Sequence, residues 1–156
     1  AVMAVAYAPP LRAMVSAEGS MVKEVSKVIV WDAASGEKRT EMTYGNLLCT
    51  VIFVPELHAI VSGDGTFMKD KESGRVVVWD IDTLEHHLKL KCAQPVTSVR
   101  YLADRRAIVS ADRGNTVILW DAESGARRWE ARTASMPWCL DAAPEIGAIV
   151  VGEANF

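Results

Sequence analysis

Short apolar runs alternate with polar turns along the whole chain, and the pattern repeats. Four similar six-residue segments begin at positions 13, 59, 107 and 148 and read AMVSAE, AIVSGD, AIVSAD and AIVVGE. Each follows a strand-like run that ends in a turn, such as VIFVP at 51–55. Runs of Val and Ile bounded by Gly, Asp, Pro and Ser are typical of strands separated by turns. The pattern therefore predicts an all-β protein built from one repeated unit.

Each complete unit contains four predicted strands. After the six-residue segment, the runs KVIVWD, RVVVWD and TVILWD begin at 27, 75 and 116, and an amphipathic stretch closes each unit. In the first unit we predict strands at 2–8, 12–17, 27–32 and 37–43. The last unit supplies two strands, which makes 14 strands in about three and a half units. The predicted units span 1–45, 46–93, 94–134 and 135–156.

The unit resembles the WD repeat, which forms one four-stranded antiparallel blade of a β-propeller. The resemblance covers the whole chain and rests on three Trp-Asp dipeptides in register, with repeat spacings of 46, 48 and 41 residues. It implies a partial propeller whose tryptophans are buried between blades and whose aspartates accept backbone hydrogen bonds. The residues to which it assigns structural roles are Trp31, Asp32, Trp79, Asp80, Trp120, Asp121, Asp64, Asp112, Ser62 and Ser110.

The repeats also depart from the family pattern. The family places a Gly-His dipeptide before the first strand of a blade, where this chain has Gly45-Asn46 and 92–94, without histidine. Glu18 and Glu153 replace the aspartate of the turn after the second strand in two units. We therefore expect degenerate blades that depend more on packing than on the family's hydrogen-bonded network.

Two units carry longer connections between their second and third strands. The spacing from the Ser of the second strand to the Trp of the third is 15 and 17 residues in the first two units, against 10 in the third. We expect neighbouring loops at 18–27 and 64–74, and loops on a rigid scaffold commonly carry function. Their apolar side chains either bind a partner or fold back on the propeller rim. The candidate partner-binding residues are Met21, Val22, Phe67, Met68 and Lys69.

A second candidate surface is the last strand of the third unit. It carries Arg127, Arg128, Trp129 and Arg132. Arginines on an exposed edge strand also discourage unwanted strand pairing, so a solvated edge is the simpler interpretation of this stretch.

Composition narrows the classes of partner. The net charge is -3 and the basic residues are scattered, which disfavours binding to nucleic acid or an anionic membrane. No apolar run is long enough to predict a membrane span. Cys49, Cys92 and Cys139 are widely spaced and form no C-x-x-C pair. They argue against a disulfide or zinc framework, so we expect an intracellular protein of the cytoplasm or nucleus.

These observations favour a non-catalytic scaffold that presents propeller loops to other proteins. We expect no catalytic residues, metal or cofactor, since the chain has no G-x-S-x-G motif and its serines recur at one register. The remaining blades would come from a longer chain or complex, or from a second copy that closes the ring. The alternative is an oxidoreductase propeller, because 120–130 (WDAESGARRWE) is similar to the docking motif of quinoprotein-type repeats.

Overall fold

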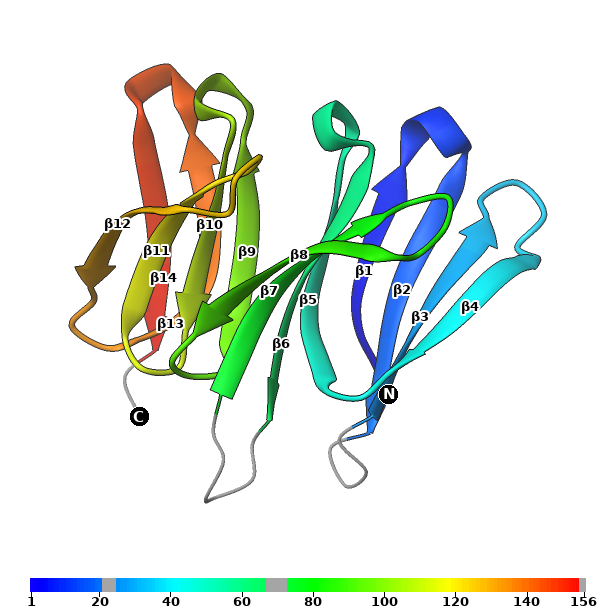
Figure 1. The fold of residues 1–156 in the computed structure, drawn as a ribbon, viewed down its shortest axis with the longest axis horizontal. Helices are drawn as coiled ribbons and strands as arrows, with labels where there is room; N and C mark the ends of the chain where they lie inside the picture. The colour runs from blue at the N-terminus through cyan, green and yellow to red at the C-terminus, as the bar shows by residue number, and fades with distance from the viewer. Residues whose placement is uncertain (21–24, 67–72, 155–156) are drawn as a thin grey trace.

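The computed structural model describes residues 1–20, 25–66 and 73–154, and it consists of antiparallel sheets (Figure 1). Three sheets have four strands and the last has two, each ordered as in the chain. The expected all-β class with four-stranded antiparallel sheets is confirmed. The helical segments of the described residues are three-residue 3-10 turns, at Pro9–Leu11, Pro55–Leu57, Ala103–Arg105 and Pro144–Ile146. No helix among the described residues is long and apolar enough to cross a membrane.

The strands are numbered in chain order. Sheet 1 contains β1 (Val2–Ala8), β2 (Ala13–Ser20), β3 (Val25–Asp32) and β4 (Lys38–Tyr44). Sheet 2 contains β5 (Leu47–Val54), β6 (Ala59–Thr66), β7 (Ser73–Asp80) and β8 (His86–Cys92). Sheet 3 contains β9 (Val96–Leu102), β10 (Ala107–Asp112), β11 (Thr116–Asp121) and β12 (Arg127–Arg132). Sheet 4 contains β13 (Met136–Ala143) and β14 (Ala148–Ala154).

The turn between the first two strands is built in the same way in every sheet. A 3-10 turn is followed by one residue in the left-handed backbone region, with φ of 47° at Arg12, 49° at His58, 46° at Arg106 and 63° at Gly147. A side chain in this region costs about 1–2 kcal/mol, so three of the four turns retain a strained residue. The repeated geometry sets where each second strand begins.

The two longer connections differ from the expected loops. The β2–β3 ladder continues to the pair Ser20 and Val25, and the β6–β7 ladder continues to Thr66 and Ser73. The equivalent β10–β11 ladder ends earlier, at the pair Asp112 and Thr116. Much of 18–27 and 64–74 therefore lengthens the hairpins, because continued pairing satisfies backbone groups that a loop would leave to water. The expectation of loops across both whole ranges was wrong.

The sheets pack face to face, with the first strand of each lying beside the first strand of the next. An apolar core fills each gap: Val30 faces Ile60 in the first interface, between sheets 1 and 2, and Val78 faces Ile108 in the second, between sheets 2 and 3. A third core lies between sheets 3 and 4. Figure 1 shows the 3-10 turns along one edge and the β2–β3, β6–β7 and β10–β11 hairpins along the opposite edge.

The two ends of this arrangement are uncovered. The outer face of sheet 1 exposes Val5 and Tyr7 by 51% and 53%, and sheet 4 exposes Trp138 and Val150 by 61% and 53%. The sheets do not close into a ring within the described residues. Apolar side chains that are covered in the middle of the molecule are therefore open to solvent at both ends.

Candidate functional site

A tryptophan and a serine form the same hydrogen bond in each four-stranded sheet. The indole N–H of the third strand donates to the serine hydroxyl of the second. Because a buried indole N–H needs an acceptor, this bond allows a large aromatic side chain to pack between sheets. The donor–acceptor distances are 2.9 Å for Trp31 to Ser16, 2.8 Å for Trp79 to Ser62 and 2.8 Å for Trp120 to Ser110.

The three tryptophans differ in burial. Trp79 and Trp120 are only 2% and 6% exposed, because each packs against the preceding sheet. Trp31 is half-buried, since no described residue covers the outer face of sheet 1. The expectation of burial between sheets therefore fails for Trp31.

The aspartate that follows each tryptophan closes the turn between the third and fourth strands. Oδ1 of Asp32 accepts the backbone N–H groups of Ala34 and Ser35, at 2.9 and 2.8 Å. Asp80 and Asp121 accept the two equivalent N–H groups in their own turns. These carboxylates fix the backbone of the turns and are committed to a structural role.

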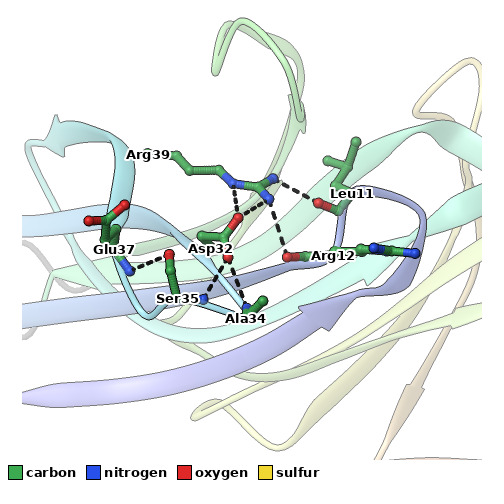
Figure 2. A network of polar contacts seen from close by, with 7 residues as sticks. All are labelled: Leu11, Arg12, Asp32, Ala34, Ser35, Glu37 and Arg39. Carbon is green, nitrogen blue, oxygen red and sulfur yellow. Dashed lines mark hydrogen bonds and ion pairs between the residues drawn. The ribbon is translucent and has the colours of Figure 1, made fainter.

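An arginine on the outer strand completes this turn in sheet 1 (Figure 2). The Arg39 guanidinium binds Oδ2 of Asp32 at 2.5 Å and donates to the carbonyl of Leu11 at 2.7 Å. It also donates to the carbonyl of Arg12, so β4 is tied to the turn between β1 and β2. The Arg39 hydrogen bond and the backbone N–H groups hold the pKa of Asp32 well below its usual range.

Sheet 3 repeats this arrangement with Arg128, which accounts for part of the second candidate surface. Arg128 binds Oδ2 of Asp121 at 2.6 Å and donates to the carbonyl of Arg105 at 2.7 Å. Arg127 pairs with Glu130 at 2.5 Å, and the Trp129 side chain is partly exposed. Arg132 donates to the carbonyl of Gly114. The three arginines of this strand are therefore all engaged within sheet 3.

The first interface contains a buried carboxylate with several donors. Asp64 is fully buried, and its Oδ2 accepts the Tyr44 hydroxyl at 2.5 Å and the Asn46 amide at 3.2 Å. Arg75 donates to the same oxygen at 3.2 Å, and its guanidinium lies 5.7 Å from the centre of the Tyr44 ring. Tyr44 meets Trp79 edge to face, with ring centres 5.0 Å apart. Of these donors, Asn46 stands at the position where the resemblance to the WD repeat led us to expect histidine.

The second interface has the equivalent carboxylate but not the equivalent donors. Asp112 is 2% exposed, and its Oδ1 accepts the backbone N–H groups of Gly114 and Thr116 at 2.9 and 3.2 Å. Its Oδ2 has no hydrogen-bond partner among the described residues, and the same is true of Oδ1 of Asp64. Burial raises the pKa of Asp112, and hydrogen bonds from Gly114, Thr116 and Gln94 oppose that shift. A cavity of about 250 Å³ lies beside this carboxylate.

Register explains the difference between the two carboxylates. In sheet 1, Tyr44 pairs with Ser26, which lies five positions before Trp31. In sheet 2, Cys92 pairs with Gly74, which lies five positions before Trp79, so Cys92 is the equivalent of Tyr44. Likewise, Arg75 stands four positions before Trp79, where sheet 3 has Thr116 before Trp120. The phenol and the guanidinium of the first interface are thus both replaced by small side chains in the second.

The remaining reactive side chains offer little chemistry. Burial raises the pKa of Cys49 to about 11 and that of Cys92 to about 12, which leaves both as neutral thiols at neutral pH. The serines of the repeat accept hydrogen bonds from tryptophan. In the part of the chain that the structure describes, no three His, Cys, Asp or Glu side chains gather in a way that could hold a metal ion.

The candidate partner-binding residues lie outside the described residues. The described strands that flank them end at Ser20 and Thr66 and resume at Val25 and Ser73. These four strand ends lie along the same edge of the molecule (Figure 1). The undescribed candidates are Met21, Val22, Phe67, Met68 and Lys69.

Comparison with known proteins gives matches at the level of the fold. The sequence matches no protein-family model and no curated protein. The computationally designed Ika4 protein is similar in structure, with a TM-score of 0.72, 21% identity, and coverage of 99% of this chain and 92% of that one. The computationally designed Ika8 protein also has a TM-score of 0.72, with 19% identity over 99% of this chain. This chain spans 46% of the Ika8 chain.

Proposed function

We propose that the chain is part of a WD-repeat β-propeller that serves as a non-catalytic interaction scaffold in the cytoplasm or nucleus. The main observation in support is the commitment of its polar groups to the framework. Ser62 and Ser110 accept from tryptophans, and Asp80 and Asp121 hold turns. This framework fixes where the second and third strands of each sheet lie, and the connections between them are where the sequence varies most in length.

The uncovered end faces support a partner that continues the arc. Trp31, Val5 and Met14 line one open face, at positions whose equivalents in sheets 2 and 3 are covered by a neighbouring sheet. Further blades of a longer protein, or a second copy of this chain, would bury this face. Light scattering after size-exclusion chromatography distinguishes the two: twice the 17.0 kDa monomer mass indicates a second copy, and a monomer favours further blades.

Scaffold function is tested at the hairpin edge. Affinity capture and mass spectrometry identify a partner, and calorimetry then measures its affinity for the purified wild type and a Phe67→Ala, Met68→Ala double variant. We expect binding to weaken by about tenfold or more, which corresponds to ~1.4 kcal/mol. A Glu56→Ala, Glu145→Ala control alters exposed residues of the opposite edge and leaves the affinity unchanged. Equal affinity in the wild type and the hairpin variant would overturn the proposal.

A further inference from the structure

The cavity beside Asp112 has the features of a receptor for one side chain of a partner. We define the Asp112 pocket by Cys92, Asp112, Thr116 and Ile118, which line it, and by a charged rim from β8 and β12. Asp112 is almost fully buried, and its Oδ2 has no donor among the described residues. A buried carboxylate oxygen without a donor is unfavourable, so a group that supplies a donor there gains binding energy.

The first interface shows one side chain that donates to the equivalent carboxylate, although Asp64 lies within a continuing ladder and Asp112 lies at the end of one. There the Tyr44 hydroxyl donates to Asp64 at 2.5 Å, while its ring packs edge to face on Trp79. In the second interface Cys92 stands at the register of Tyr44. The phenol and the guanidinium of the first interface have no equivalents beside Asp112, where a cavity of about 250 Å³ lies. Oδ2 of Asp112 is shielded from solvent, so an entering phenol must displace the side chains that cover it before it can donate as Tyr44 does to Asp64.

The charged residues at the rim of the Asp112 pocket favour one kind of hydrogen-bond donor from a partner. Lys91, Arg127 and Arg132 line the pocket together with Glu130, so the rim carries more positive than negative charge. A neutral hydroxyl can donate to Asp112 without adding positive charge to this rim. Acidic residues on either side of the incoming group would complement the basic rim.

We propose that the Asp112 pocket binds a tyrosine side chain of a partner protein, with acidic residues flanking that tyrosine. The phenol hydroxyl donates to Asp112 Oδ2, and the ring contacts Cys92 and Ile118. This inference rests on the proposed scaffold function and deepens it by naming the chemistry of one partner segment. It places a second contact between sheets 2 and 3, beside the end of the β10–β11 hairpin.

The test uses blocked tripeptides, so it does not depend on finding the natural partner. Chemical-shift titration of the wild-type protein compares Glu-Tyr-Glu, Glu-Phe-Glu and Lys-Tyr-Lys peptides. We expect saturable binding of Glu-Tyr-Glu in the millimolar range, and binding of each of the other two weaker by about tenfold, because one lacks the hydroxyl and the other the complementary charge. Equal binding of the tyrosine and phenylalanine peptides, or no binding of Glu-Tyr-Glu up to ~20 mM, would overturn the proposal.

Protein variants locate the binding. Cys92→Tyr supplies a phenol from the chain itself and Thr116→Arg restores the guanidinium of the first interface, so each is expected to abolish peptide binding. Cys92→Ser leaves the pocket open and is the matched control that retains it. If one filling variant fails to fold, the other decides. Undiminished binding in a folded filling variant contradicts the assignment.

The two proposals can fail separately. Loss of partner binding in the Phe67→Ala, Met68→Ala variant with normal binding of Glu-Tyr-Glu supports both contacts. Hairpin-dependent partner binding without any tyrosine preference removes the pocket proposal and leaves the scaffold proposal intact. If Glu-Tyr-Glu binds as expected but the Phe67→Ala, Met68→Ala variant binds the partner as tightly as the wild type, the scaffold proposal fails and the pocket proposal stands.

Discussion

The first and second interfaces share one framework but supply different hydrogen-bond donors to a buried aspartate. In both, a tryptophan from the later sheet donates to a serine at 2.8 Å, and an apolar core fills the gap. Asp64 receives side-chain donors from Tyr44, Asn46 and Arg75 on Oδ2, whereas Asp112 receives backbone donors on Oδ1, and the other oxygen of each carboxylate has no partner among the described residues. The comparison indicates that the core and the tryptophan maintain an interface even where the side-chain network is reduced.

The largest expected effect tests that shared framework. Trp120→Ala and Trp79→Ala should each lower the free energy of unfolding by ~3–5 kcal/mol, because each removes a large buried side chain and leaves a cavity. Trp31→Ala should cost clearly less, since Trp31 is half-buried. Urea denaturation followed by circular dichroism measures all three. Equal losses for Trp31 and Trp120 would contradict a role that depends on burial between sheets.

The next largest effect separates the two carboxylates. Asp64→Asn should destabilise the fold by ~2–3 kcal/mol at neutral pH, because it breaks the pairing with Arg75 and disturbs the Tyr44 hydrogen bond. Asp112→Asn removes a buried charge that forms no ion pair among the described residues and should change stability by less than ~1 kcal/mol. Chemical denaturation of both variants measures the difference. Similar losses would mean that backbone donors stabilise Asp112 as well as side chains stabilise Asp64.

A reciprocal exchange at one register sharpens the comparison. Cys92→Tyr fills the cavity and gives Asp112 Oδ2 a donor, so it should stabilise the protein by ~0.5–1 kcal/mol. Tyr44→Cys should destabilise it by ~2 kcal/mol, since it opens a cavity and leaves Asp64 with fewer donors. Thermal unfolding of the two single variants measures both. A lower melting temperature for Cys92→Tyr would show that the pocket cannot take the ring without strain.

The smallest expected effect is a pH dependence. Because burial raises the pKa of Asp112, the folded protein holds its proton more tightly than the unfolded chain. Stability from this group is complete below the ordinary pKa of 3.8 and decreases as pH rises above it toward the folded-state pKa. Asp112→Asn should remove this decrease. Denaturation of wild type and variant at a series of pH values measures it, and parallel curves would contradict the predicted shift.

Local regularities of the sequence predicted the fold well, because each strand carries its own pattern. The registers of Trp31, Trp79 and Trp120 indicated four-stranded units, and the sheets have that number of strands. The lengths of the β2–β3 and β6–β7 hairpins were not predictable, since polar strand ends and polar loops have the same composition. A repeated spacing could have predicted the role of the outer-strand arginine, because Arg39 and Arg128 each follow the Asp they bind by seven residues.

Contacts between units were harder to foresee. The Tyr44–Asp64 hydrogen bond joins two sheets, and neither its donor nor Arg75 recurs in the second interface. A contact that occurs once leaves no repeated trace in a single sequence. The cavity beside Asp112 became visible only when the equivalent positions of the two interfaces were compared.

The arrangement of strands also has a dynamic consequence. Hydrogen bonding links strands within each sheet, while successive sheets are separate ladders joined mainly through side chains. All residues of β10 are buried and all residues of β12 are exposed. Amide protons of β12 should therefore exchange with solvent deuterium by local fraying, well before those of β10. Each sheet would then open from its outer strand inward, and the slowest exchange would mark the second strands as the last part of the protein to lose structure.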